Sequence, residues 1–258
     1  MKLAIIGGSL LKQIDRFDII SQEQIHTPYG EPSDSFIIAE INGLDVIYLN
    51  RHAQSHHIAP HQINYKANMF AMKLLDVSHV VAVTAVGGIT EKMSPMKWAV
   101  PDQIIDYTHG RGQTYTDIND SSVNHIDFTY PFDESLSDQV KQAMQAVNCD
   151  HEPTATYGVT QGPRLETIAE IRRMHRDGCD IVGMTAMPEA GLARELDIDY
   201  ATMSLVVNWA AGAGESAESA DKKAEIITME EIRERVEQGS TMAEDIIQQL
   251  AIQLAGQI

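Results

Sequence analysis

The sequence predicts an α/β fold, in which strands and helices alternate along one chain. Two observations carry this prediction. Short apolar runs bounded by turn residues recur through the 258 residues, and segments with helical periodicity separate several of them. Matches to helix-capping patterns mark where two of the helices begin. Together these features favour a central sheet covered by helices.

Seven segments are typical of buried strands, since each is a short apolar run that ends at turn residues. These predicted strands cover residues 3–6, 36–41, 46–49, 79–85, 154–160, 180–184 and 200–207. Five segments have the apolar spacing of helices that bury one face. These predicted helices cover residues 64–75, 134–147, 167–177, 188–196 and 228–254.

Local side-chain chemistry indicates several helix ends. Thr167 with Glu170, and Thr228 with Glu231, match the capping box. In that pattern a hydroxyl and a carboxylate three residues later satisfy backbone N–H groups that the first helical turn leaves free. Gly178 stands where a helix-terminating glycine is expected.

Two stretches are predicted to be loops. Residues 87–124 combine two prolines, scattered glycines and a polar run, which favours long functional loops over a domain linker. Residues 212–223 are small and polar directly after a strand, which fits a solvated connection better than a mobile lid over a pocket. We therefore expect a single domain that spans residues 1–258.

Composition and charge narrow the function classes. The chain has 19 Lys and Arg against 37 Asp and Glu, and its net charge of −18 repels nucleic acids and anionic membrane surfaces. Cys149 and Cys179 form neither a disulfide pattern nor a metal-binding pattern, which favours a reducing cytoplasm. The apolar N-terminal run is shorter than the roughly 20 residues that span a bilayer. Partners among nucleic acids and membranes are therefore not expected.

Two segments suit the binding of an anion. At residues 5–10 a strand runs into two glycines and Ser9, so backbone N–H groups and a hydroxyl are available, although a tight turn without a ligand also explains the glycines. Residues 50–61 contain Arg51 and four histidines. Arg51 offers a planar fork of donors to an oxyanion and His52 adds another donor, whereas a polar surface loop is the alternative.

Further candidate side chains follow other predicted strands. Ligands of open α/β sheets sit beyond the carboxyl ends of strands, so Thr84 and Thr185 are well placed to contact one. A strand-to-turn transition that needs no ligand explains the glycines after Thr84 equally well. Asn208 also ends a strand, and its carboxamide carries the donors and the acceptor that an amide-like edge requires. Glu166 stands near a helix start, where the helix dipole alone is sufficient to favour an acidic residue.

Taken in order across nearly the whole chain, these segments resemble the trimeric purine nucleoside phosphorylases, in particular their methylthioadenosine and methylthioinosine phosphorylase branch. The sequences IHTPYGEPSD at 25–34, INYKAN at 63–68 and MPEAGLARELDIDYA at 187–201 strengthen the resemblance. It implies an α/β fold whose mixed central sheet is partly barrel-like and flanked by helices. It also implies a homotrimer that acts on a purine nucleoside and inorganic phosphate, with no metal and no organic cofactor.

The resemblance assigns roles to individual residues. The implied phosphate site consists of Ser9, Arg51, His52, Thr84, Ala85 and Thr185. The implied nucleoside site consists of Met184 near the ribose, of Leu165, Glu166 and Asn208 at the purine, and of Ile227 and a neighbouring subunit's His125 at the 5′ group. Catalytic roles fall to Asn208, Glu166 and His52.

The expected base follows from hydrogen-bond complementarity. A 6-oxopurine presents N1–H to the Glu166 carboxylate, while its O6 and N7 suit the Asn208 carboxamide. Relatives specific for 6-aminopurines are expected to have aspartate in place of Asn208 and of Ala210. A site that reads one exocyclic group rejects its replacement by as much as about 10⁴-fold. We therefore expect hypoxanthine or guanine as the base.

The 5′ group points to S-methyl-5′-thioinosine as the substrate. Relatives that accept a 5′-hydroxyl are expected to carry a histidine in the C-terminal part, but no histidine follows His175. Phosphate would attack C1′ through a cationic transition state, so catalysis rests on positioning and electrostatics. The enzyme alternatives are a general inosine and guanosine phosphorylase, a methylthioadenosine phosphorylase and a hydrolytic nucleosidase. A nucleoside-binding protein is the non-enzyme alternative, because Leu10, Ala53 and Leu165 depart from the family pattern.

Overall fold

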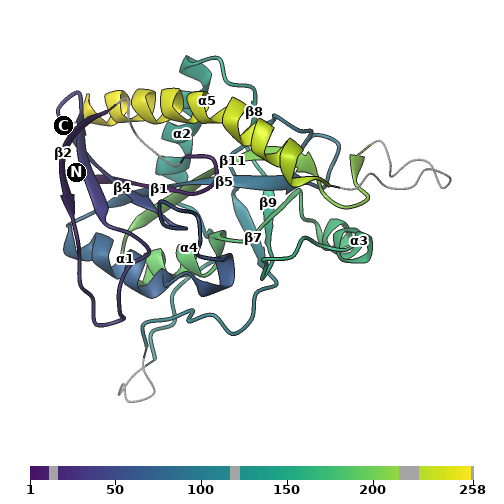
Figure 1. The fold of residues 1–258 in the computed structure, drawn as a ribbon, viewed down its shortest axis with the longest axis horizontal. Coiled ribbons are helices and arrows are strands. Elements are labelled where there is room, and N and C mark those ends of the chain that lie inside the picture. Colours follow the sequence, from purple (N-terminus) through teal and green to yellow (C-terminus); the bar gives the residue numbers. More distant parts are fainter. Residues whose placement is uncertain (12–16, 117–122, 215–226, 257–258) are drawn as a thin grey trace.

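The computed structural model describes residues 1–11, 17–116, 123–214 and 227–256, and it confirms the predicted α/β fold (Figure 1). The described strands join in one eleven-stranded sheet that mixes parallel and antiparallel pairs. They are β1 (Leu3–Gly7), β2 (Asp18–Glu23), β3 (Phe36–Ile41), β4 (Leu44–Asn50), β5 (His79–Gly88), β6 (Trp98–Ala99), β7 (Gln103–Asp106), β8 (His151–Glu152), β9 (Thr156–Val159), β10 (Ile181–Gly183) and β11 (Asp199–Trp209).

Helices cover both faces of the sheet. They are α1 (Tyr65–Leu74), α2 (Glu134–Ala146), α3 (Ile168–Asp177), α4 (Ala186–Glu195) and α5 (Met229–Ala255). In Figure 1, α5 and α2 lie on one side of the sheet and α1 and α4 on the other. Alternate residues of the central strands supply the two cores: Ile5 and Val81 face α2 and α5, while Ile6 and Val80 face α1 and α4. Each predicted helix is therefore confirmed, with small differences at its ends.

The predicted helix signals are mostly confirmed. Thr167 and Glu170 form a complete capping box at the start of α3. Gly178 ends the same helix with φ of +97°, a conformation that glycine adopts without strain. At the start of α5 only half of the predicted box forms. The Thr228 hydroxyl accepts from the Glu231 N–H, but the Glu231 carboxylate contacts that hydroxyl rather than the Thr228 backbone N–H.

The predicted strands are all present, but the predicted loop at 87–124 is wrong in part. It contains the short strands β6 and β7, which have two and four residues; β6 lies between β11 and β8, and β7 lies at an edge of the sheet beside β9. Of the stretch 212–223, residues 215–223 lie outside the described residues, so its interpretation as a connection or a lid stays a prediction. No helix in the described part of the chain is long and apolar enough to cross a membrane.

The sheet has a gap along one edge of β5. On one side, β5 pairs with β11 along its whole length. On the other side, pairing with β1 ends at Ala82, and pairing with β10 begins only at Gly87. Residues 83–86 therefore have no strand partner on that edge. Because β1 is parallel to β5 and β10 is antiparallel to it, the carboxyl ends of β1 and β10 point toward this gap from opposite directions.

Candidate active site

A cavity of about 280 Å³ lies at the gap in the pairing of β5. Most of the residues that the sequence analysis singled out line it, namely Ser9, Arg51, His52, Thr84, Ala85, Leu165, Glu166, Met184, Thr185, Asn208 and Ile227. They come from segments far apart in the chain. Thr84 and Ala85 lie within β5 beside the gap, and most of the others lie at or after the carboxyl ends of β1, β4, β9, β10 and β11. His125 is exposed and does not line this cavity, so its role at a neighbouring subunit stays a prediction.

The turn after β1 packs closely against the segment after β4. The backbone N–H of Arg51 donates to the Gly7 carbonyl at 3.0 Å, and this hydrogen bond connects the two segments. A Cβ on Gly8 would lie 3.2 Å from Arg51 Nη1, so glycine allows the guanidinium to approach the backbone of the turn. The Ser9 hydroxyl lies 3.3 Å from His56 Nε2. This corner of the cavity therefore gathers a guanidinium, a hydroxyl and backbone groups, the combination that binds an oxyanion.

A buried carboxylate holds Arg51 in place. Glu189, in the first turn of α4, accepts from Arg51 Nε and Nη2 at 2.8 Å each, and Arg51 Nη1 lies beside Gly8. The Tyr200 hydroxyl donates to the same carboxylate at 2.8 Å. Burial lowers the pKa of Arg51, but the nearby Glu189 carboxylate raises it by more. The net pKa is therefore raised, and the guanidinium stays protonated. Glu189 thus positions the guanidinium toward the cavity.

His52 is held as a neutral ring. Its Nδ1 lies 2.8 Å from the Ile58 carbonyl, so Nδ1 carries the proton and Nε2 is an acceptor. Burial, with a contribution from the Arg51 cation, lowers the pKa of His52 to about 4. The sequence predicts that His52 donates a hydrogen bond to an oxyanion. In this tautomer Nε2 is instead an acceptor, so it suits an oxygen that carries a proton.

We expect His52 to make the folded state less stable at acid pH. The unfolded chain binds a proton near the ordinary pKa of 6.5 and the folded chain only near 4, so stability falls as pH drops through that window. The shift is worth at most about 3 kcal/mol. Urea unfolding of the wild type and His52→Gln near neutral pH and at about pH 4.5 measures it. The variant should lose less stability between the two conditions, and equal losses would contradict the assignment.

Hydroxyls from two strands form the far wall of the anion-binding corner. The Thr84 hydroxyl on β5 is buried and lies 2.8 Å from the Ser204 hydroxyl on β11. Thr185 lies two residues after β10, at the start of α4; it is buried as well and lines the same cavity. Because β10 runs antiparallel to β5, its end comes back alongside Thr84 and Ala85. The predicted phosphate-binding residues therefore share one side of the cavity.

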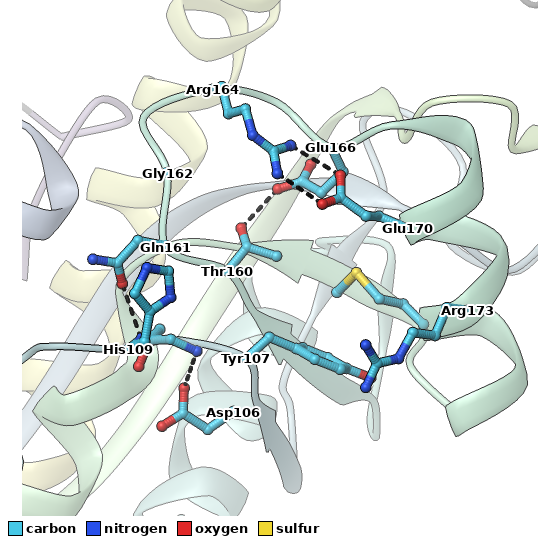
Figure 2. Close-up of a pocket in the computed structure, with 12 residues that line it drawn as sticks. Asp106, Tyr107, His109, Thr160, Gln161, Gly162, Arg164, Glu166, Glu170 and Arg173 are labelled. Atoms are coloured by element: carbon cyan, nitrogen blue, oxygen red, sulfur yellow. Dashed lines mark hydrogen bonds and ion pairs between the residues drawn. The ribbon is translucent and has the colours of Figure 1, made fainter.

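The other side of the cavity carries a carboxylate and a carboxamide. Glu166 Oε1 accepts from the Thr160 hydroxyl at 2.6 Å (Figure 2). Asn208 stands just after an irregularity in the pairing of β11 with β5, a distortion that redirects side chains at strand ends. Its Nδ2 donates to the Trp209 carbonyl at 2.6 Å. Leu165 is 39% exposed, so it covers this side without being packed into the core.

A second cavity of about 600 Å³ adjoins the first, and Glu166 lines both (Figure 2). Arg164 and Glu170 bridge its rim with two hydrogen bonds, of 2.9 and 2.7 Å. The Arg164 guanidinium holds the pKa of Glu170 at about 2, well below its ordinary value. The Arg164 guanidinium and the Glu170 carboxylate at this rim thus form an ion pair with each other.

Arg111 is a site residue that the sequence analysis missed. Its guanidinium donates to the carbonyl oxygens of Met184 (2.8 Å), Met187 (2.6 Å), Thr160 (3.2 Å) and Gln161 (2.8 Å). It thereby joins the segment after β9, which leads to Glu166, to the segment after β10, which carries Met184 and Thr185. It also donates to Gln161 Oε1 and to the Tyr65 hydroxyl, at 3.2 Å each. Most of its partners are backbone carbonyls, which every residue possesses, so no sequence pattern marks them.

Comparison with known proteins agrees with this geometry. Residues 2–251 match the family described as the phosphorylase superfamily. The chain is 42% identical over 249 residues to a probable S-methyl-5′-thioinosine phosphorylase of Xanthomonas campestris, covering 96% of each protein. It is 39% identical to the 6-oxopurine nucleoside phosphorylase of Pyrococcus furiosus, over 82% of this chain and 80% of that protein.

A solved structure shows the same architecture. The methylthioadenosine phosphorylase of Schistosoma mansoni in complex with adenine superposes with a TM-score of 0.90 at 26% identity, over 99% of this chain and 92% of that one. The fold and the resemblance inferred from the sequence are both confirmed. The chain belongs to the phosphorylase superfamily.

Proposed function

We propose that the protein catalyses the phosphorolysis of S-methyl-5′-thioinosine to hypoxanthine and 5-methylthioribose 1-phosphate. One observation carries the proposal: a single cavity joins an anion-binding side, with Arg51 and Ser9, to a base-reading side, with Glu166 and Asn208. The Xanthomonas relative carries the name of this activity, and the Pyrococcus relative that of a 6-oxopurine nucleoside phosphorylase. Both names agree with the base expected from Asn208.

The anion-binding side delivers phosphate to the sugar. Arg51 and the hydroxyls of Ser9, Thr84 and Thr185 hold three of the phosphate oxygens, and neutral His52 accepts from an oxygen that is protonated. A phosphate oxygen then forms a bond to C1′ while the bond from C1′ to purine N9 breaks. The sugar becomes cationic in the transition state, and the negative phosphate stabilises it without a covalent enzyme intermediate.

The base-reading side stabilises the departing purine. As the glycosidic bond breaks, its electron pair moves to the purine ring. Glu166 accepts from N1–H, while the Asn208 amide donates to O6 and its carbonyl accepts from N7 once N7 is protonated. The leaving group therefore meets complementary hydrogen-bonding groups along the whole edge that gains charge.

The proposal also covers the part of the cavity that holds the 5′ group of the nucleoside, and the assembly of the subunits. Met184 and Ile227 give the cavity an apolar wall for a methylthio group. His125 of a neighbouring subunit would close this end in a homotrimer, the assembly that the resemblance implies. Phosphate is a co-substrate, and no metal or organic cofactor takes part. We place this activity in a single domain of residues 1–258 acting in the cytoplasm, as a step in the salvage of purines.

A general inosine and guanosine phosphorylase is the second candidate. The Pyrococcus relative, named for 6-oxopurine nucleosides without a methylthio group, favours it. The two candidates share the phosphate and base sides and differ only at the 5′ group. Comparison of inosine with S-methyl-5′-thioinosine at equal phosphate therefore separates them.

We expect base release to depend on phosphate. The purified protein is incubated with S-methyl-5′-thioinosine, S-methyl-5′-thioadenosine and inosine, with and without phosphate, and the free base is quantified. The proposal predicts hypoxanthine from the first nucleoside only when phosphate is present, with the second nearly inert. Release without phosphate would indicate a hydrolase, and binding without any release would indicate a nucleoside-binding protein.

A further inference from the structure

We propose that Thr160 is a specificity-determining residue, which holds the Glu166 carboxylate as a hydrogen-bond acceptor toward the purine and so favours 6-oxopurines over 6-aminopurines. The inference rests on the proposed function of the cavity. It adds a positioning residue that does not itself line the side of the cavity where phosphate and base meet. Thr160 lines the adjoining cavity instead, behind Glu166 (Figure 2).

The Thr160 hydroxyl has two acceptors within reach and one proton to donate. Glu166 Oε1 lies at 2.6 Å, and the Gly183 carbonyl lies at 3.3 Å. The Gly183 carbonyl already accepts from the Thr160 backbone N–H at 2.8 Å. The hydroxyl proton therefore goes to Glu166, in a short hydrogen bond of the kind that a carboxylate accepts.

The position of the hydroxyl is fixed by the backbone that carries it. The Thr160 N–H is bound to Gly183, and the Thr160 carbonyl accepts from Arg111 Nη2 at 3.2 Å. Arg111 also holds the Gln161 carbonyl at 2.8 Å. Thr160 therefore meets Glu166 with a donor whose place does not depend on the ligand, which is how a supporting residue sets the geometry of a binding group.

The nearby cation does not compete for Glu166. Arg164 lies two residues away, but its guanidinium makes two hydrogen bonds to Glu170. Within the described part of the chain, Thr160 is the donor that the structure gives to Glu166. The orientation of the carboxylate thus rests on one hydroxyl rather than on an ion pair.

This arrangement selects between the two kinds of purine. The N1 of a 6-oxopurine carries a proton and donates, whereas the N1 of a 6-aminopurine is an acceptor. When Oε1 of the Glu166 carboxylate accepts from Thr160, the other oxygen remains free to accept from a ligand. It can accept from the N1–H of a 6-oxopurine, but it repels the N1 lone pair of a 6-aminopurine. A site with one fixed polarity leaves the wrong partner unpaired, and such mismatches carry most of the discrimination between similar substrates.

The test compares Thr160→Val, which keeps the branched shape and removes the hydroxyl, with Thr160→Ser, which keeps the hydroxyl. We expect Thr160→Val to lower kcat/KM for S-methyl-5′-thioinosine by about tenfold, the effect of one hydrogen bond to a charged group. The value for S-methyl-5′-thioadenosine and the KM for phosphate should not change. Hypoxanthine should inhibit Thr160→Val about tenfold more weakly than it inhibits the wild type, whereas inhibition by adenine should be the same in both. In Thr160→Ser the ratio of the two kcat/KM values should equal that of the wild type.

Each other outcome has a definite meaning. Equal losses for both nucleosides, or a raised KM for phosphate, would show a general structural role and overturn the inference. Loss of the substrate ratio in Thr160→Ser as well would also overturn it, since the hydroxyl would then not be the cause. If the wild type turns over neither nucleoside, the proposed function fails, and the affinities for hypoxanthine and adenine still test Thr160.

Discussion

Replacing Glu189 with glutamine is expected to lower the free energy of unfolding by roughly 3–5 kcal/mol, the cost of leaving a buried cation without its partner. Arg51 and Glu189 are 1% and 0% exposed, so water cannot replace the lost charge. The amide keeps the shape of the carboxylate, so the change is one of charge and hydrogen bonding rather than of packing. Tyr200→Phe, which removes a single hydrogen bond to Glu189, should show a smaller loss of about 1.5–3 kcal/mol.

Urea unfolding with and without phosphate measures the effect. Phosphate brings a negative charge to Arg51, so it should raise the stability of Glu189→Gln more than that of the wild type. Glu234→Gln, an exposed position on α5, is the matched control and should leave stability nearly unchanged. A loss in Glu189→Gln no larger than in this control would show that the buried pair does not hold the site together.

Asn208→Asp is expected to move base preference toward 6-aminopurines. The carboxamide donates to O6 of a 6-oxopurine, whereas a carboxylate repels O6 and accepts from a 6-amino group. The ratio of kcat/KM for S-methyl-5′-thioinosine to that for S-methyl-5′-thioadenosine should fall by about 100-fold or more, within the range known for sites that read one exocyclic group. Asn208→Ala should lower this ratio by less than Asn208→Asp does, because it removes the donor to O6 without placing a negative charge beside that oxygen.

Steady-state rates with both nucleosides at saturating phosphate provide this measurement. The KM for phosphate serves as the internal control, because the phosphate-binding residues come from other strands. An unchanged ratio in Asn208→Asp, with activity retained, would refute the assignment of Asn208 as the residue that reads the base.

The strands that build the site could be predicted because they are buried on both faces. β1, β5 and β11 are almost wholly buried, so their sequences are continuous apolar runs that end sharply at polar or glycine residues. The same property locates Ser9 and Asn208, since each stands where an apolar run stops, and it marks Thr84 as a polar residue within such a run. Strand ends in a sheet of this class are the places where ligands bind, so candidate residues follow from the strand prediction.

Other elements have no such signature. β2 is a largely exposed edge strand that carries no apolar alternation, and β6 and β8 have two residues each. Glu189 gives one indirect signal, because it is an acidic residue among the apolar residues of α4 and a buried charge needs a partner. The sequence does not reveal that the partner is Arg51, since 138 positions separate them. Pairing across such distances depends on topology, which local patterns do not encode.

The gap along β5 also separates two parts of the sheet that contribute different residues to the cavity. Ser9, Arg51 and His52 of the anion-binding corner belong to the part built from β1 and β4, while Thr185 and the segments that carry Glu166 and Met184 follow β9 and β10 on the other part. We therefore expect substitutions near Glu166 to alter the choice of base without displacing Ser9, Arg51 or His52. Proteins whose names specify adenine-type and hypoxanthine-type nucleosides share this scaffold. The unpaired stretch of one strand thus lets two separately built parts of the sheet contribute residues to one cavity.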